Sequence, residues 1–310
     1  MNVLVDIPAR GGSKGIPRKN LRTLLGISLV GWAVLAARRS RVLLGTSAAL
    51  RILVDTDDEE IAREGRAWGA EVPFLRPPEL ARDESPTAAS VVHAVGRYRD
   101  SGWASDGVIL LQPTSPLRSA EDVVACAAPF LAGAAESVVS VSPLEHPLEL
   151  AYRRGEAGVL TPVMPGSGGA VRRQDGTPAV FPSGAVYVLR AALLSRSERF
   201  IHDGATLGIE LPKNRSLDID TEADLALAES VARGEALAAP PEAAAAAGRW
   251  HEVDLGALSA EFTGLEEMVG ARGALGLRVT APRSWSEARI FDGVAACRRA
   301  TGLPVVAATS

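Results

Sequence analysis

A glycine-rich segment with basic residues is the part of the sequence whose composition is best suited to chemistry. It reads Arg10-Gly-Gly-Ser-Lys-Gly15, and Lys19 follows it. Glycine has no Cβ, so the backbone N–H groups of such a segment can converge on an anion. Arg and Lys side chains in turn suit phosphate oxygens. The order is neither a Walker A loop nor Gly-x-Gly-x-x-Gly. The segment indicates either a phosphate cradle or, taken alone, a glycine turn with solvated basic residues.

A pair of carboxylates late in the sequence suits a metal ion. Asp218 and Asp220 are two residues apart in a predicted strand, residues 216–220, so both side chains should point to one face. Oxygen ligands of this kind hold Mg²⁺, with substrate phosphates and water completing the shell. The alternative is a solvated strand end with helix-capping acids, which explains Glu222 and Asp224 better than it explains the pair.

The elements that must position these residues alternate between strand and helix. We predict strands at residues 3–7, 51–54, 71–75, 108–111, 137–141, 184–189 and 216–220, and helices at 28–40, 58–68, 84–99, 119–131 and 221–233. Asp57 and Ser119 are predicted helix caps, and Thr221 with Asp224 has the spacing of a capping box. The β-α-β-α order predicts a mostly parallel twisted sheet with helices on both faces.

In such folds ligands bind beyond the carboxyl ends of the strands. The loops after Ile7, Val54 and Leu111 should therefore form one rim and bring Arg10, Asp55 and Gln112 together. The acidic residues 55–58 either touch a ribose or cap the following helix, and capping is the better interpretation for Asp57 and Asp58.

Three further regions depart from this alternation. Residues 144–174 are rich in glycine and proline, which suggests an excursion or a hairpin arm. Residues 234–249 are rich in alanine and proline and resemble a linker. Residues 250–310 contain a predicted strand at 275–280, a helix at 284–300 and a strand at 304–308, which is about one βαβ unit and small for an independent core. The predicted domains are thus 1–233 and a small α/β appendage at 250–310.

Composition excludes several classes of protein. The net charge of −4 gives no broad basic surface for nucleic acid. The two cysteines, Cys126 and Cys297, and four scattered histidines show no spacing typical of zinc ligands or of a disulfide scaffold. No apolar run reaches the ~20 residues of a membrane span, and the first residues do not resemble a signal peptide. A cytoplasmic protein is the expectation.

The motifs together resemble those of the acylneuraminate cytidylyltransferases. Residues Ile7 to Asn20 resemble the signature of that family. Four more motifs follow in the same order as in that family within residues 1–233: Arg76 with Leu80 to Asp83; Leu111 to Arg118; Arg173 and Gln174 with Gly184 to Tyr187; and Leu217 to Leu225.

The resemblance implies a Rossmann-like nucleotidyltransferase fold and the transfer of CMP from CTP to a hydroxyl of an N-acylneuraminate or a related nonulosonate, with release of pyrophosphate. It also implies Mg²⁺, and a homodimer in which residues 144–174 form the arm. Arg10, Lys19, Asp218 and Asp220 would be catalytic, the last two as metal ligands. The expected nucleotide-binding residues are Ala9, Arg10, Gly11, Gly12, Ser13, Lys19, Asn20, Arg76 and Ser85, and the expected substrate-binding residues are Gln112, Arg173 and Tyr187.

The sugar-facing part of the sequence departs from that family. Glu149 stands where a lysine follows the Glu-His-Pro turn, Phe181 replaces an arginine, and Ser183 replaces an asparagine. Glu149 should disfavour a carboxylate ligand by repulsion, although Arg173 could still hold one. Two alternatives therefore stay open: a cytidylyltransferase for a different sugar or a cyclitol, and a nucleotide-binding homologue without catalysis.

Overall fold

A six-stranded sheet forms the centre of the protein. The computed structural model describes residues 1–164, 176–238, 250–254, 276–281 and 305–309. The strand order is β10-β6-β9-β5-β1-β4, and β9 alone runs antiparallel to its neighbours in this sheet. The strands are β1 (Asn2–Pro8), β4 (Ala49–Asp55), β5 (Gly107–Leu110), β6 (Ser137–Pro143), β9 (Val180–Arg190) and β10 (Thr206–Glu210). The predicted mostly parallel sheet is confirmed.

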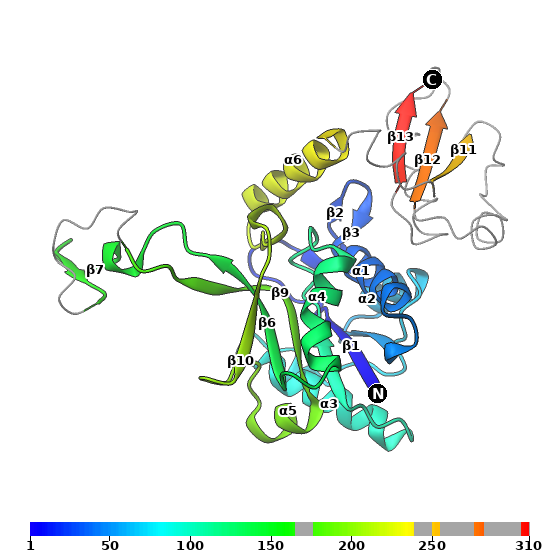
Figure 1. Cartoon of the computed structure of the whole chain (residues 1–310), viewed down its shortest axis with the longest axis horizontal. Helices are drawn as coiled ribbons and strands as arrows, with labels where there is room; N and C mark the ends of the chain where they lie inside the picture. The colour runs from blue at the N-terminus through cyan, green and yellow to red at the C-terminus, as the bar shows by residue number, and fades with distance from the viewer. Residues whose placement is uncertain (165–175, 239–249, 255–275, 282–304, 310) are drawn as a thin grey trace.

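Helices cover both faces of the sheet (Figure 1). On one face α1 (Leu29–Leu44) packs against α2 (Glu59–Ala67) and α4 (Ala120–Leu131), and on the other α3 (Thr87–Asp100) packs against α5 (Ala191–Ser197). β1 lies between the two layers, and its residues Val3, Leu4, Val5 and Ile7 are buried because both faces of the strand are covered. A small hairpin, β2 (Thr23–Leu24) and β3 (Ile27–Ser28), precedes α1.

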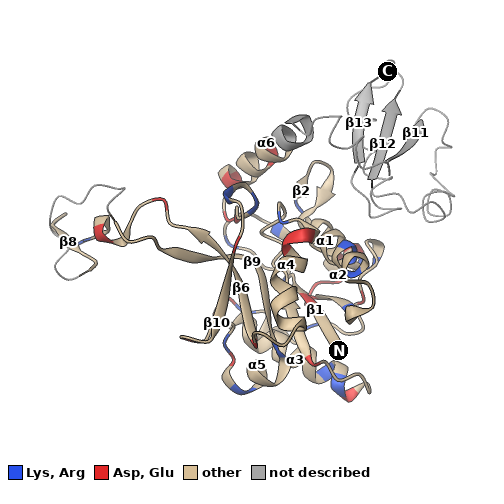
Figure 2. Ribbon diagram, viewed as in Figure 1, with Lys and Arg blue, Asp and Glu red and all other residues tan. Residues whose placement is uncertain are grey.

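Local capping chemistry sets where several helices begin. The Ser119 side chain accepts from the backbone N–H of Asp122, and the Asp122 carboxylate accepts from the backbone N–H of Ser119. Thr221 and Asp224 make the same reciprocal pair at the start of α6 (Glu222–Ala238). Both predicted caps are confirmed, and Figure 2 shows acidic residues at the beginnings of α4 and α6, where they complement the helix dipole.

Of the two residues predicted to cap α2, Asp58 does so and Asp57 does not. Asp58, and not Asp57, accepts hydrogen bonds from the backbone N–H groups of Glu60 and Ile61, at 2.9 and 3.0 Å. Asp57 turns instead towards the glycine-rich loop, where it accepts from Gly11.

Two predicted strands are absent from the described structure. Residues 71–75 make only an isolated bridge between Leu53 and Glu71, because Pro73 has no N–H to continue a ladder. Residues 216–220 form no strand and lie beyond the end of β5, where Ile219 donates to the carbonyl of Thr114 at 2.8 Å. The sixth strand of the sheet is β10, which the sequence pattern did not reveal.

A long arm projects from the sheet, as Figure 1 shows. β6 and β9 pair from Ser137 to Pro143 and lead into a second hairpin, β7 (Tyr152–Arg154) and β8 (Leu160–Pro162). The predicted hairpin excursion is confirmed for the described part of residues 144–174, while 165–174, including Arg173, lie outside the described residues.

The C-terminal region contains a separate three-stranded parallel sheet. It consists of β11 (Trp250–Asp254), β12 (Gly276–Ala281) and β13 (Val305–Thr309). The two predicted strands are confirmed, β11 was not predicted, and the predicted helix at 284–300 lies outside the described residues. α6 extends to Ala238, so the first part of the predicted linker is helical. Within the described part of the chain, no helix is both long and apolar enough to cross a membrane.

Candidate active site

Two adjoining cavities lie at the carboxyl ends of the parallel strands. The first, here called the cradle cavity, has a volume of about 430 Å³ and is lined by Pro8, Arg10, Gly12, Ser13, Lys14, Gly15, Lys19, Asn20, Arg76, Thr87, Gln112, Pro113, Thr114, Asp218 and Asp220. The second, the arm cavity, has a volume of about 770 Å³ and lies where β6 and β9 leave the sheet. Gln112 and Asp218 line both, so these two residues mark the boundary between the cavities.

The basic residues of the glycine-rich loop are held by an acidic residue from a distant segment. Asp83 forms ion pairs with Arg10 and Lys14, each at 2.8 Å. Lys14, followed by Arg10, lowers the pKa of the Asp83 carboxyl. An anion thus already lies between two cations that we predicted to bind phosphate, and a triphosphate would take the place of that carboxylate.

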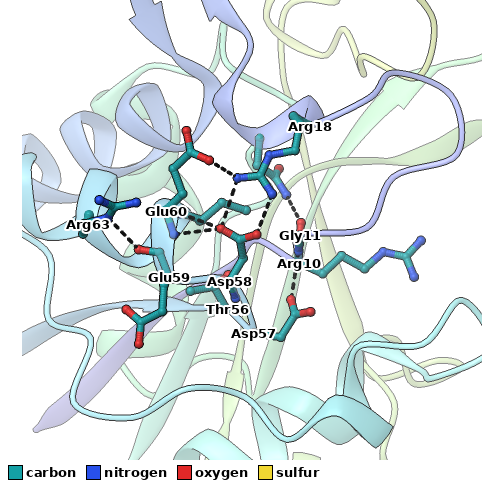
Figure 3. A network of polar contacts seen from close by, with 11 residues as sticks. Arg10, Gly11, Arg18, Thr56, Asp57, Asp58, Glu59, Glu60 and Arg63 are labelled. Carbon is teal, nitrogen blue, oxygen red and sulfur yellow. Dashed lines mark hydrogen bonds and ion pairs between the residues drawn. The ribbon is translucent and has the colours of Figure 1, made fainter.

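The amide of Gly11 is engaged by the protein and does not face the cradle cavity. It donates to Asp57 Oδ1 at 2.8 Å, as Figure 3 shows. Beside it Arg18 pairs with Asp58 and Glu60, and the Arg10 side chain points away from this network. Gly11 is therefore a structural residue of the loop, and the predicted anion contact passes to the neighbouring residues Gly12 to Gly15, which do line the cavity.

The loop and the last motif meet directly. Lys19 Nζ lies 2.9 Å from Asp220 Oδ1 and 2.9 Å from the carbonyl oxygen of Ile219. Asn20 is buried and donates to the carbonyl of Arg10 at 2.9 Å, which fixes the shape of the loop. Residues about 200 positions apart in sequence thus form one wall of the cradle cavity, as predicted for Lys19, Asn20 and Asp220.

Asp218 and Asp220 fit a divalent cation only together with substrate oxygens. Both carboxylates line the cradle cavity. Loss of water around Asp218 raises the pKa of its carboxyl, and the neighbouring Asp220 raises it further, against the hydrogen bond from Thr114. A cation between the two would relieve that repulsion. No cluster of three His, Cys, Asp or Glu side chains suited to a metal occurs in the described ranges, and Mg²⁺ is often held by one or two carboxylates with phosphates and water.

Arg76 reaches the cradle cavity from a buried ionic cluster. Its guanidinium lies 2.8 Å from Asp55 Oδ2, and both side chains are almost wholly buried. Asp6 on β1 is also buried; burial raises the pKa of its carboxyl well above the usual range, and the negative charge of Asp55 adds to that rise. Arg10 and Gln112 share the predicted rim, whereas Asp55 lies behind Arg76 and does not line the cavity.

Besides Gly11, two further predicted nucleotide-binding residues do not line the cradle cavity, and other lining residues were missed. Ala9 is fully buried in the core, and the Ser85 hydroxyl donates to the carbonyl of Glu79 at 2.6 Å. Thr87 and Thr114 line the cavity instead, and short polar residues of this kind gave no signal in the sequence.

The sequence pattern also did not indicate the role of Arg118, which contacts Gln112 at the boundary between the two cavities. It is buried, and its guanidinium donates to the carbonyl of Gln112. Burial lowers the pKa of Arg118 to about 9, while the charges of Asp218 and Asp122 oppose that shift. Arg118 therefore fixes the turn that presents Gln112 to both cavities.

The arm cavity is lined by both apolar and polar side chains. Leu144, Phe181 and Leu217 contribute apolar surface, while Gln112, Ser183, Tyr187, His146, Glu145 and Lys213 contribute polar groups. The predictions for Gln112 and Tyr187 agree with this placement. Gly184 is required beside them, because its φ is +79° and a Cβ there would lie 3.0 Å from Gln112 Oε1.

The expected repulsion by Glu149 is not supported in this cavity. Glu149 is not among the residues that line it, and its carboxylate accepts from the backbone N–H of Thr177 at 3.2 Å. The short helical turn at Leu148–Leu150 directs it there. The acidic residues in the cavity wall are Glu145 and Asp218.

Comparisons with known proteins agree with this geometry. The cytidylyltransferase family model matches residues 4–146. The CMP-N,N'-diacetyllegionaminic acid synthase of Legionella pneumophila is 31% identical over 240 residues, covering 74% of this chain and 96% of that protein. The pseudaminic acid cytidylyltransferase of Campylobacter jejuni is 30% identical over 229 residues, covering 74% and 95%. In fold, the chain is similar to a CMP:2-keto-3-deoxy-manno-octonic acid synthetase solved with CTP, with a TM-score of 0.53 at 16% identity, over 76% of this chain and 100% of that one.

Proposed function

The chain belongs to the cytidylyltransferase family, and we propose that it activates an N-acylated nonulosonic acid as its CMP conjugate. Transfer of CMP from CTP to an acid sugar is the reaction that it shares with its relatives. The observation that carries the proposal is the pair of cavities that meet at Gln112 and Asp218. One suits a triphosphate, the other suits a sugar, and reaction between two ligands requires such a shared boundary.

The cradle cavity would hold CTP by its phosphates. Lys19, Lys14 and Arg10 supply positive charge, and Gly12 to Gly15 allow the backbone to approach the phosphates closely. A hydroxyl of the sugar in the arm cavity would then attack the α-phosphate near Gln112, and pyrophosphate would leave towards the basic loop. The same cations stabilise the charge that develops on the leaving group.

Asp218 and Asp220 would hold Mg²⁺ together with phosphate oxygens. When bound, the cation neutralises charge on the attacking and leaving oxygens. Lys19 holds Asp220 in place through its 2.9 Å contact, and Thr114 orients Asp218 by a hydrogen bond.

The arm cavity favours a sugar with N-acyl groups over a bare polyol. Phe181 is 42% exposed and lines this cavity with Leu144 and Leu217, which gives acyl methyl groups an apolar surface. The Legionella relative is named for an N,N'-diacetylated sugar. We therefore expect a diacetylated nonulosonic acid to be a better substrate than N-acetylneuraminate.

A pyrophosphate-release screen tests the proposal. Four nucleoside triphosphates would be crossed with N,N'-diacetyllegionaminic acid, pseudaminic acid, N-acetylneuraminate, the eight-carbon acid Kdo and a neutral cyclitol, all with Mg²⁺. Release with CTP and a nonulosonic acid is the expected result. Release only with the cyclitol would assign a different acceptor, and CTP binding without release from any acceptor would assign a nucleotide-binding homologue.

The metal assignment has its own test with a matched control. Asp218→Asn and Asp220→Asn should each lower kcat by about 100-fold or more, the scale of losing a group that stabilises transition-state charge. Glu222→Gln, two residues away, should keep wild-type activity, because Glu222 pairs with Arg22 and lines neither cavity. Unchanged kcat in Asp220→Asn, or activity that survives chelation of divalent cations, would refute the assignment.

A further inference from the structure

We propose that Lys213 is the residue that receives the carboxylate of the acid sugar and so determines the choice of acids over neutral acceptors. The inference rests on the proposed function and names the group that recognises its substrate. Among the lining residues of the arm cavity that the structure describes, Lys213 is the one with a permanent positive charge. Its side chain is 70% exposed, so a ligand can reach it.

Lys213 is held in a defined relation to the reaction boundary. It begins the short turn Lys213–Arg215, in which Ser216 donates back to the carbonyl of Lys213 at 3.2 Å. The neighbouring Arg215 anchors this turn to α4 through an ion pair with Asp122 at 2.9 Å. Lys213 and Asp218 are five residues apart on one anchored segment, and both line the arm cavity. A carboxylate bound at Lys213 would therefore fix the rest of the sugar relative to Asp218.

The structure already places a carboxylate on Lys213. Its Nζ forms an ion pair with Glu145, which is 54% exposed and lines the same cavity. Glu145 stands in for the carboxylate of a ligand, because both are anions presented to one ammonium group from the cavity side. We infer that the sugar carboxylate displaces Glu145 from Lys213. Glu145 then competes with the substrate for Lys213, and Lys213 attracts the substrate.

The distribution of lysines is an independent observation in the same direction. The chain has 33 Lys and Arg residues, of which only Lys14, Lys19 and Lys213 are lysines. Lys14 and Lys19 line the cradle cavity, and Lys213 lines the arm cavity. Elsewhere the chain uses arginine for positive charge. All three lysines of this chain thus line a cavity in which we propose that an anion binds. Lysine suits that role because it is a compact point charge on a flexible stem.

Competition between Glu145 and the sugar carboxylate for Lys213 predicts that two variants change the KM for the acid sugar in opposite directions. Lys213→Met should raise the KM for the accepted acid sugar by about 10-fold or more, as for loss of a charge-assisted hydrogen bond, and leave the KM for CTP unchanged. Glu145→Gln should lower the KM for the acid sugar. If the ion pair were only structural, both variants would break the same contact and shift the KM in the same direction, and that outcome would overturn the proposal.

Two controls complete the experiment: the methyl ester of the sugar as a substrate, and a variant that removes a positive charge outside both cavities. Lys213→Met should not weaken use of the ester, which has no carboxylate, and Lys213→Arg should recover part of the lost affinity. Arg199→Met removes one positive charge from an exposed residue that lines neither cavity, and should leave every KM unchanged. A loss with the ester as large as that with the acid would refute the role of Lys213.

Direct binding separates this inference from the proposed function. Calorimetric titration of the acid and its ester into the full chain, with CTP present, would be compared in wild type and Lys213→Met. Acid-selective binding that depends on Lys213 without pyrophosphate release would refute the proposed function and keep the inference. Pyrophosphate release that is indifferent to Lys213 would refute the inference alone, and absence of both would refute both.

Discussion

Gly15 is the residue at which the glycine-rich loop touches the segment that carries Asp218 and Asp220. A Cβ built there would lie 2.2 Å from the carbonyl oxygen of Asp220, a backbone atom that cannot move without moving the carboxylate beside it. The close approach of two backbones, and not an unusual φ, is what requires glycine at this position.

Gly15→Ala is therefore expected to separate Lys19 and Asp220 from their present geometry. A displacement of about 1 Å in a site of this kind costs roughly 100-fold in rate, so kcat should fall by about that factor. Gly96→Ala is the control: an added Cβ on α3 meets nothing within 4 Å, and alanine should raise the unfolding free energy by up to ~1 kcal/mol. Steady-state kinetics and thermal unfolding measure both. Wild-type kcat in Gly15→Ala would contradict the explanation.

Asp6 is a carboxylic acid in the core, so the stability of the fold depends on whether its side chain is protonated. Its oxygens have no hydrogen-bond partner among the described residues, and burial together with Asp55 raises its pKa. An acid with a raised pKa binds its proton more tightly when folded. Its contribution to stability is thus present at low pH and is lost as the pH rises from about 4 towards the folded pKa.

Asp6→Asn should consequently be tolerated, because the amide has the shape and neutrality of the protonated acid. We expect the variant to gain stability relative to wild type as the pH is raised from 4 to 8, measured by denaturant unfolding at each pH. Arg76→Met should instead destabilise the protein by ~3–5 kcal/mol, because it leaves the buried Asp55 without its partner. Equal pH dependence of Asp6→Asn and wild type would show that Asp6 is not protonated.

At the scale of elements, the residue that caps α2 also contacts Arg18, which follows the glycine-rich loop in the chain. Asp58 caps this helix and also forms an ion pair with Arg18 at 2.6 Å (Figure 3). The hydrogen bond from Arg18 is the main reason that the pKa of Asp58 is lowered. An acid with a lowered pKa stabilises the fold above its unfolded pKa, about 4, and that stabilisation is lost as the pH falls through the folded value.

The two roles of Asp58 can be separated by substitution. Asp58→Ala removes the cap and the ion pair and should cost ~1–2 kcal/mol at pH 7, whereas Asp58→Asn keeps a capping oxygen and should cost less. The difference between wild type and Asp58→Asn should shrink below pH 4 and in high salt. Glu60→Gln removes another partner of Arg18 without touching the cap. Urea unfolding at pH 3 and 7 checks this, and a difference that grows on acidification would contradict it.

At the scale of the whole molecule, the arm exposes apolar side chains that a monomer would leave in water. Tyr152, Val159, Leu160 and Val163 are all between 38% and 65% exposed. Figure 2 shows that β6 and β9, which carry the arm, bear almost no charged residues. Exposed apolar surface of this extent is typical of a protein interface, and this agrees with the homodimer that the resemblance implies.

We therefore expect a dimer whose interface includes the arm. Val159→Asp combined with Leu160→Asp should shift the mass measured by light scattering from dimer to monomer at micromolar concentration, because each places a charge in an apolar contact. Val42→Asp, at an even more exposed apolar residue near the end of α1, should leave the mass unchanged. A monomeric wild type, or a doubly substituted chain that stays dimeric, would refute the role of the arm.

The sequence pattern predicts five of the six strands of the central sheet, every α-helix of that domain except α5, and the residue types of the site. Buried runs such as residues 3–7 and 108–111 form strands because their apolar side chains satisfy both faces of a sheet, and Ser119 and Thr221 begin helices through contacts within four residues. These choices depend on local free energies, which a linear pattern records. The pattern misplaced residues 71–75 and 216–220 because it does not record where a strand finds its partner.

Which polar groups of the site already have a partner in the protein, and which are open to a ligand, depends on how the chain folds in three dimensions. Asp57 takes the amide of Gly11, Asp83 lies between Arg10 and Lys14, Glu149 turns away from the arm cavity, and Lys213 enters it. Most of these contacts join residues tens of positions apart, so they follow from how the elements pack and not from the spacing of any motif. For that reason the sequence alone predicted a phosphate cradle and a pair of carboxylates for a metal ion, whereas Lys213, which we propose binds the sugar carboxylate, became visible only in the folded chain.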